Sequence, residues 1–135
     1  PILAQPNCHF ISLQYTDCIE ELANFKAKFS MDIHHWQEAI DDYDETAALV
    51  SSLDMVITVC TSIVHLTGAV GRPAWVMVPA IPEWRYLREG NRMPWYPSVK
   101  LFRQNGLNEW ESVLQQVSQA LKEQAESAVQ RHTEP

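Results

Sequence analysis

The chain has 135 residues, of which ten are Lys or Arg and seventeen are Asp or Glu, giving a formal charge of −7 at pH 7. Apolar types make up 46% and charged types 20%, as in an ordinary globular protein, and the length suits one domain. No apolar run approaches the roughly 20 residues that cross a bilayer, and the acidic balance argues against nucleic acid as a partner. We therefore expect neither a membrane span nor a nucleic-acid site.

The first third of the chain predicts a strand, a helix and a region without a clear pattern. The apolar run Cys8–Leu13 contains β-branched and aromatic residues and predicts a strand. Asp17 followed by Glu20 has the spacing of a capping box, which predicts a helix start, with an apolar face formed by Ile19, Leu22 and Phe25. The pattern between residues 29 and 40 is ambiguous, and a short strand at Ile33 is one interpretation.

The middle of the chain predicts a strand–helix–strand unit with a right-handed crossover. The acidic residues 42–45 favour a helix start through the helix dipole and predict a helix near residues 44–53. The run Met55–Val59 is continuously apolar, which is typical of a strand covered on both faces in a parallel sheet. Apolar residues at helical spacing then follow at residues 63–70 and predict a helix. Gly71 with Pro73 ends that helix, and Ala74–Val78 predicts a second buried strand.

Residues 79–97 are too rich in proline for a regular element and too aromatic for a solvated linker. Loops of this length in compact domains are often functional, so we expect an ordered loop with a role in binding. The segment Val99–Arg103 then predicts the last strand.

A long helix is predicted at the end of the chain. Asn108 and Glu111 have capping-box spacing, and the apolar residues from Trp110 onward recur at helical intervals. The polar residues 127–135 are expected to fray, which leaves a domain at 1–126. The fold class expected from all these elements is α/β, Rossmann-like, with a mostly parallel sheet of about four or five strands flanked by helices.

The start of the helix after residue 60 is the most informative candidate site. In open α/β sheets ligands bind beyond the carboxyl ends of the strands, and Thr61 and Ser62 lie at such an end. Free backbone N–H groups and the positive end of the helix dipole favour a phosphate or diphosphate there, and both hydroxyls add donors. His65 in the first turn would face the same anion. The alternative is an ordinary Ser/Thr N-cap with a buried histidine packed on the sheet.

Three further features have both a functional and a structural interpretation. Cys60 is either a thiol nucleophile activated by the helix start or an inert buried cysteine. The segment Pro82–Tyr86 places Trp84 and Arg85 where they either contact a ligand or form part of a packed lid. The adjacent pair His34–His35 points in two directions, so it is a poor joint metal ligand and is expected to lie in a loop.

The three cysteines Cys8, Cys18 and Cys60 form neither a disulfide framework nor a zinc-ligand pattern. We therefore expect reduced thiols, a cytoplasmic location, and no metal or cofactor. The chain opens without a signal peptide and without an initiator Met, which indicates a piece of a longer polypeptide.

The string T-S-x-x-H-L-x-G-A-x-G-x-P at residues 61–73 resembles the carboxyl-terminal domain of the heptosyltransferase-like glycosyltransferases. Four further segments resemble, more narrowly, the bacterial proteins that join tetratricopeptide repeats to such a domain. These segments are Trp75–Pro79, Glu83–Tyr86, Pro94–Pro97 and Leu101–Gln104. It covers roughly residues 8–118 and is densest from 42 to 104.

The resemblance implies a GT-B fold, in which two Rossmann-like domains face each other across a cleft. The carboxyl-terminal domain of that fold holds a nucleotide-sugar donor without a metal ion. The donor diphosphate would sit at Thr61 and Ser62, with His65 nearby. Many relatives carry Asp at the position of Cys60, so the identity of the donor sugar stays open. The residues implied around the nucleoside or the sugar are Gln14, Asp17, Asp42, Tyr43, Cys60, Trp84 and Arg85.

The resemblance also places the catalytic base in an amino-terminal domain and implies an opening strand and helix ahead of residue 8. We therefore expect the donor-binding domain of an inverting, metal-independent glycosyltransferase, inactive as an isolated chain, whose partners are the amino-terminal domain and tetratricopeptide repeats of its parent. The alternative is a non-catalytic binding or assembly module that keeps this half-fold. Such a module would use the helix from residue 109 onward, or the aromatic loop, as a protein interface.

Overall fold

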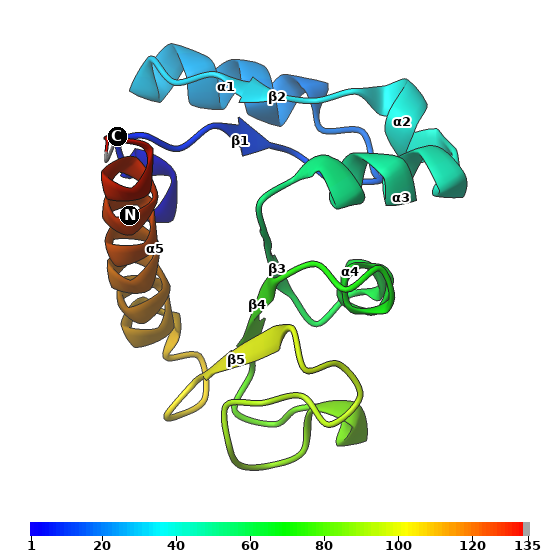
Figure 1. Cartoon of the computed structure of the whole chain (residues 1–135), viewed down its shortest axis with the longest axis vertical. Helices are drawn as coiled ribbons and strands as arrows, with labels where there is room; N and C mark the ends of the chain where they lie inside the picture. Colours follow the sequence, from blue (N-terminus) through cyan, green and yellow to red (C-terminus); the bar gives the residue numbers. More distant parts are fainter. Residues whose placement is uncertain (134–135) are drawn as a thin grey trace.

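The computed structural model describes residues 1–133 (Figure 1). Helices are labelled α, strands β and single turns of 3-10 helix η. The first part of the chain contains η1 (Ile2–Ala4), β1 (Phe10–Ile11), α1 (Ile19–Phe29), β2 (Ile33–His34) and α2 (Gln37–Asp41). The second part contains α3 (Tyr43–Ser52), β3 (Val56–Val59), α4 (Ser62–Ala69), β4 (Ala74–Val78), η2 (Trp84–Tyr86), β5 (Val99–Arg103) and α5 (Trp110–Thr133).

The fold is α/β with parallel sheets flanked by helices, as the sequence predicts. The prediction of one sheet is wrong, because the five strands within residues 1–133 form a pair, β1-β2, and a separate sheet in the order β3-β4-β5. In the three-stranded sheet Val56 lies opposite Ala74 of the central strand, and Ala74 lies opposite Val99. The two sheets stay apart because no strand among residues 1–133 lies between β1 and β3.

Alternate side chains of the three-stranded sheet enter two separate cores, which explains why apolar residues occupy successive positions in its strands. On one face Val56, Val76 and Leu101 pack against α3 and α4 through Val50 and Val64. On the other face Trp75 and Phe102 pack against α5 through Val113, Val117 and Leu121. The predicted strand–helix–strand unit therefore exists, and it carries the best-buried part of the chain.

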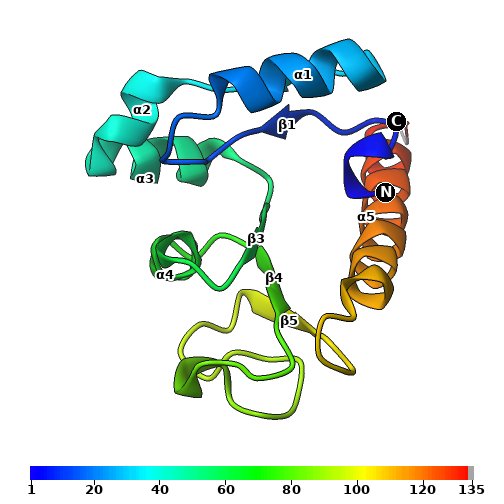
Figure 2. The same ribbon diagram turned by 180° about the vertical axis from the view of Figure 1, so that it is seen from behind.

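The first part of the chain is packed much less tightly. No residue of η1, β1, α1, β2 or α2 is fully buried, although Cys18 just before α1 is. The predicted strand Cys8–Leu13 is reduced to Phe10–Ile11, because its partner β2 also has only two residues. Figures 1 and 2 show this part at one end of the molecule, the three-stranded sheet toward the other, and α5 running along one side.

Two helix starts differ from their predicted capping. The N-cap of α1 is Cys18, one residue after the predicted N-cap Asp17. The carboxylate of Asp17 accepts a hydrogen bond from the backbone N–H of Ile19 at 3.1 Å. Asn108 is not an N-cap, because its φ of 62° lies in the left-handed region and α5 begins at Trp110. The capping-box interpretation of Asn108 with Glu111 is therefore wrong.

The end of α5 also differs from the prediction. The helix continues through residues 127–133, where the sequence predicts a frayed tail. Local contacts support these turns, since Ser127 Oγ donates to the carbonyl of Glu123 at 2.8 Å and Arg131 Nε donates to the carbonyl of Ser127 at 3.3 Å. Residues 134 and 135, the rest of that predicted tail, lie outside the described residues. None of the helices in residues 1–133 combines the length and the apolar character that a membrane crossing requires.

Candidate functional site

The start of α4 lies directly beyond the carboxyl end of β3. Thr61 occupies the N-cap position with an extended backbone, but its side chain makes no capping hydrogen bond. Its hydroxyl lies instead 3.2 Å from the hydroxyl of Thr58 and 3.5 Å from the carbonyl oxygen of Val59. Within residues 1–133 the backbone N–H groups of Ser62 and Ile63 have no hydrogen-bond partner, and Ser62 is exposed. This helix start therefore presents free donors, which is not the arrangement of an ordinary Ser/Thr cap.

His65 faces the proline-rich loop. Its half-buried ring meets the ring of Tyr96 edge-on, with 5.8 Å between the centroids. One helical turn further on, Gly68 lies under the same Tyr96 ring, so close that a Cβ atom would overlap it. The predicted alternative, a histidine packed on the sheet, is thus replaced by a histidine packed against the loop.

Cys60 lies between β3 and α4 and is half-buried beside Tyr86. Its sulfur lies 3.9 Å from the carbonyl oxygen of Met77, and the thiol interacts electrostatically with the Tyr86 hydroxyl. Burial raises the pKa of Cys60 and also raises the pKa of Tyr86 well above its ordinary value. A thiol held in its neutral form is a poor nucleophile, so the geometry favours the inert interpretation of Cys60.

Tyr86→Phe is expected to lower the free energy of unfolding by about 1 kcal/mol at neutral pH, because the buried phenol loses its polar interaction with the Cys60 thiol. The raised pKa keeps the phenol neutral in the folded chain, whereas an unfolded tyrosine ionises near about pH 10. The parent chain should therefore lose stability as the pH rises above about 10, and the variant should lose less. Urea titrations at neutral and alkaline pH measure both effects. The control is Tyr15→Phe, which alters an exposed tyrosine; an equal loss there would contradict the prediction.

The loop at residues 79–97 is attached to the sheet by Arg103 at the end of β5. Its Nε donates to the carbonyl of Gly90 at 2.6 Å and its Nη1 donates to the carbonyl of Leu87 at 3.0 Å. Its Nη2 donates to the carbonyls of Tyr86 and Glu89. Because one guanidinium group joins four backbone carbonyls, it fixes the course of the loop beside the carboxyl ends of the strands. Nothing in the sequence marks Arg103 as a loop anchor beyond a basic side chain at a strand end.

Trp84 and Arg85 form an exposed cluster within that loop. The Trp84 ring is 69% exposed and meets the Trp95 ring edge-on, with 6.0 Å between the centroids. Arg85 lies over Trp84, with its guanidinium carbon 5.1 Å from the ring centroid, and makes an ion pair of 2.8 Å with Glu83. The cluster lies beyond the carboxyl end of β4, on the predicted side of the sheet, but Arg85 already has an anionic partner.

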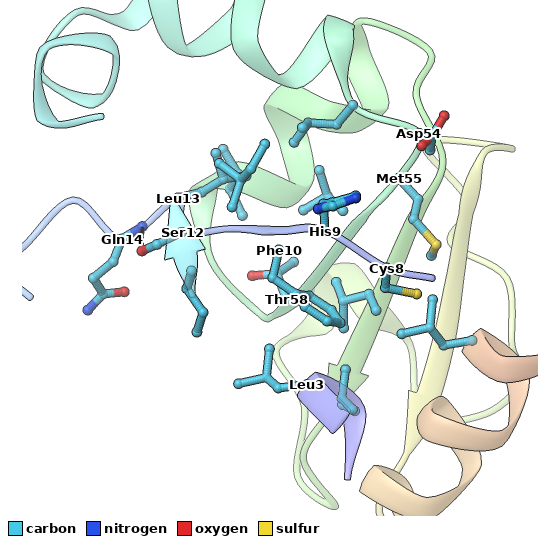
Figure 3. A pocket seen from close by; sticks show the side chains of 18 of the residues that line it. Leu3, Cys8, His9, Phe10, Ser12, Leu13, Gln14, Asp54, Met55 and Thr58 are labelled. Carbon is cyan, nitrogen blue, oxygen red and sulfur yellow. Dashed lines mark hydrogen bonds between the residues drawn. The ribbon is translucent and has the colours of Figure 1, made fainter. Parts of the chain in front are cut away.

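A cavity of about 1260 Å³ separates the two sheets (Figure 3). It brings together four of the predicted site residues, because Gln14, Tyr43, Thr61 and Ser62 all contribute to its lining. The lining does not include the other predicted residues, which are Asp17, Asp42, Cys60, His65, Trp84 and Arg85.

The two predicted aspartates have local structural roles. Asp42 caps α3, since its carboxylate accepts from the backbone N–H groups of Asp44 at 2.9 Å and Glu45 at 3.0 Å. Asp17 accepts from Ile19 at the start of α1. Helix capping therefore accounts for both carboxylates.

The histidine pair points in two directions, as predicted. His34 lies in β2 and stacks on Trp36, whereas His35 lies 3.7 Å from the Cys18 sulfur through Nδ1 and 3.0 Å from Gln37 Oε1 through Nε2. The prediction of a loop is wrong for His34, which pairs with Ile11. Across residues 1–133, no three His, Cys, Asp or Glu side chains are grouped as metal ligands.

Together these features define an α/β domain with two parallel sheets, a large cavity between them, and an uncapped helix start at the cavity wall. No known protein family and no solved structure matches the chain. The chain is 38% identical over 131 residues to Protein FlbA of Caulobacter vibrioides. The match covers 94% of this chain and 21% of FlbA, so the chain spans about a fifth of the length of that relative.

Proposed function

We propose that this chain is the nucleotide-sugar donor-binding domain of an inverting, metal-independent glycosyltransferase of the GT-B type. The observation that supports this most directly is the start of α4, where the N–H groups of Ser62 and Ile63 have no partner within residues 1–133. A helix start with free N–H groups beyond the carboxyl end of a parallel strand suits a diphosphate.

In the proposed reaction an acceptor hydroxyl attacks the anomeric carbon of the donor sugar and the nucleoside diphosphate departs. The start of α4 stabilises the charge that develops on the departing diphosphate. Gln14 and Tyr43 border the same space as Thr61 and Ser62, and in this proposal they contact the nucleoside beyond the carboxyl ends of the strands. The acceptor-side domain and the catalytic base belong to other parts of a longer cytoplasmic protein in this proposal.

The test is calorimetric titration of the full-length protein with ADP, GDP, UDP and CDP. A hydrogen bond to a charged partner contributes about 1.5–3 kcal/mol, so Ser62→Ala should weaken the affinity for the preferred diphosphate roughly ten- to hundredfold. The matched control is Ser51→Ala on α3, whose hydroxyl donates to the carbonyl of Ala47 at 2.7 Å, and it should bind as the parent does.

Two results would overturn the proposal. One is the absence of measurable affinity for all four nucleotides, which would favour a binding or assembly module instead. The other is an unchanged affinity in Ser62→Ala together with a lower melting temperature, which would make Ser62 a structural residue only.

A further inference from the structure

The two parallel sheets end in two strand edges that border the same cavity. β1 pairs only with β2, and β3 pairs only with β4, so among residues 1–133 each has one edge without a strand partner. Residues of both edge strands line the cavity between the sheets, as the close view in Figure 3 shows for Phe10 and Thr58.

The backbone of each edge strand directs hydrogen-bonding groups into this space. The N–H of Val56 donates to the carbonyl of Pro73 on the β4 side, at 3.0 Å. Because successive N–H groups of a strand alternate between its two edges, those of Ile57 and Val59 point toward the cavity. In the same way, the backbone N–H of Ser12 donates to the carbonyl of His34 in β2 at 2.8 Å. The N–H of the preceding residue, Ile11, therefore points toward the cavity.

The sequence of β3 is that of an interior strand. Natural edge strands usually carry charges or proline that prevent further pairing, whereas Val56–Val59 carries neither. A strand that is apolar at every position except Thr58 is typical of the centre of a parallel sheet, yet Val59 is 44% exposed. On the opposite side of the cavity, Leu22 and Phe25 of α1 also line the space and are only half-buried.

We propose that the cavity between β1 and β3 receives one further parallel strand, supplied by the same polypeptide through a helix that leads into Pro1. The five strands and the added strand then form one sheet in the order β2-β1-added-β3-β4-β5. This is the order of the doubly wound α/β fold, 3-2-1-4-5-6, with the added strand in the central position. The unpaired edges of β1 and β3 are its two hydrogen-bonding partners.

The position of η1 supports this connection. Connections between parallel strands of one sheet are right-handed. The connection from the added strand to β1 crosses the sheet in one direction, and the connection from β3 to β4 crosses it in the opposite direction. Its helix must therefore cover the face opposite α4, which is the face covered by α5.

The chain already enters from that face. Ile2 packs into the core that α5 forms with Trp75 and Phe102, and Gln5 Nε2 donates to Ser118 Oγ of α5 at 2.7 Å. Figure 1 shows the N-terminus beside α5. The relative FlbA shows that a protein with this stretch can be long enough to contribute such a segment, because the match covers 21% of its length.

The test is amide hydrogen exchange on the full-length polypeptide that contains these residues. The N–H groups of Ile57, Val59 and Ile11 should exchange as slowly as that of Thr58, which faces β4 and serves as the internal reference. Fast exchange at Ile57 and Val59 beside slow exchange at Thr58 would overturn the proposal. Protection that disappears on dilution would also overturn it, because the added strand would then come from a second copy.

A photo-crosslinking residue at position 59 identifies the segment that fills the cavity. It should attach, within one polypeptide, to residues that precede Pro1. A crosslink to another copy, or to residues after Pro135, would overturn the proposal. Neither experiment involves a nucleotide, so its outcome is independent of the proposed function.

Discussion

Gly68→Ala is expected to lower the free energy of unfolding by about 1–3 kcal/mol, although alanine is the better helix former. A Cβ atom at this position on α4 would lie 2.6 and 2.7 Å from two carbons of the Tyr96 ring. The ring has to move, and the loop that carries it then loses its contact with His65 as well. Urea unfolding of the full-length protein, followed by fluorescence, measures the effect.

A second background separates steric overlap from other effects of the substitution. In a Tyr96→Ala chain the obstructing ring is absent, so Gly68→Ala should be neutral or stabilising there. A loss of similar size in both backgrounds would show that the overlap with Tyr96 is not the cause. A Gly68→Ala variant as stable as its parent would contradict the close packing of α4 against the loop.

Arg103→Ala is expected to release the loop at residues 79–97 and to lower the free energy of unfolding by about 3 kcal/mol. The reason is that hydrogen bonds from a charged donor contribute about 1.5–3 kcal/mol, and this guanidinium group serves several backbone carbonyls at once. Limited proteolysis should cut the variant within the loop before it cuts the rest of the chain. The matched control is Arg88→Ala, an exposed arginine of the same loop, and equal cleavage rates in the two variants would contradict the prediction.

The sequence predicts those parts of the fold that depend on local patterns. The boundaries of β4 and β5 match the predictions, and β3 differs by one residue, because apolar runs between turn residues define buried strands directly. The division into two sheets could not be predicted in this way. It depends on which strand lies beside which, and no local pattern in Phe10–Ile11 reports that its second edge lacks a partner.

The candidate site was predictable to a similar extent. The helix start at Thr61 and Ser62 follows from a strand, two hydroxyl residues and a helical stripe in sequence order. The hydrogen bond between the hydroxyls of Thr61 and Thr58 was not predictable, since it depends on a side-chain rotamer. Asp17 and Asp42 lie at helix starts, as the sequence also predicts, and a carboxylate there is used for capping more often than for binding.

The position of α5 has a consequence for the order in which the chain is completed during translation. α5 is the last of these elements to be synthesised, yet it covers Trp75 and Phe102 and also holds Ile2 near the start of the chain. Neighbouring strands of the three-stranded sheet are only about 20 residues apart in sequence, so this sheet can form while it is being made. One face of it then remains open to water, and to chaperones, until residues 110–133 have left the ribosome.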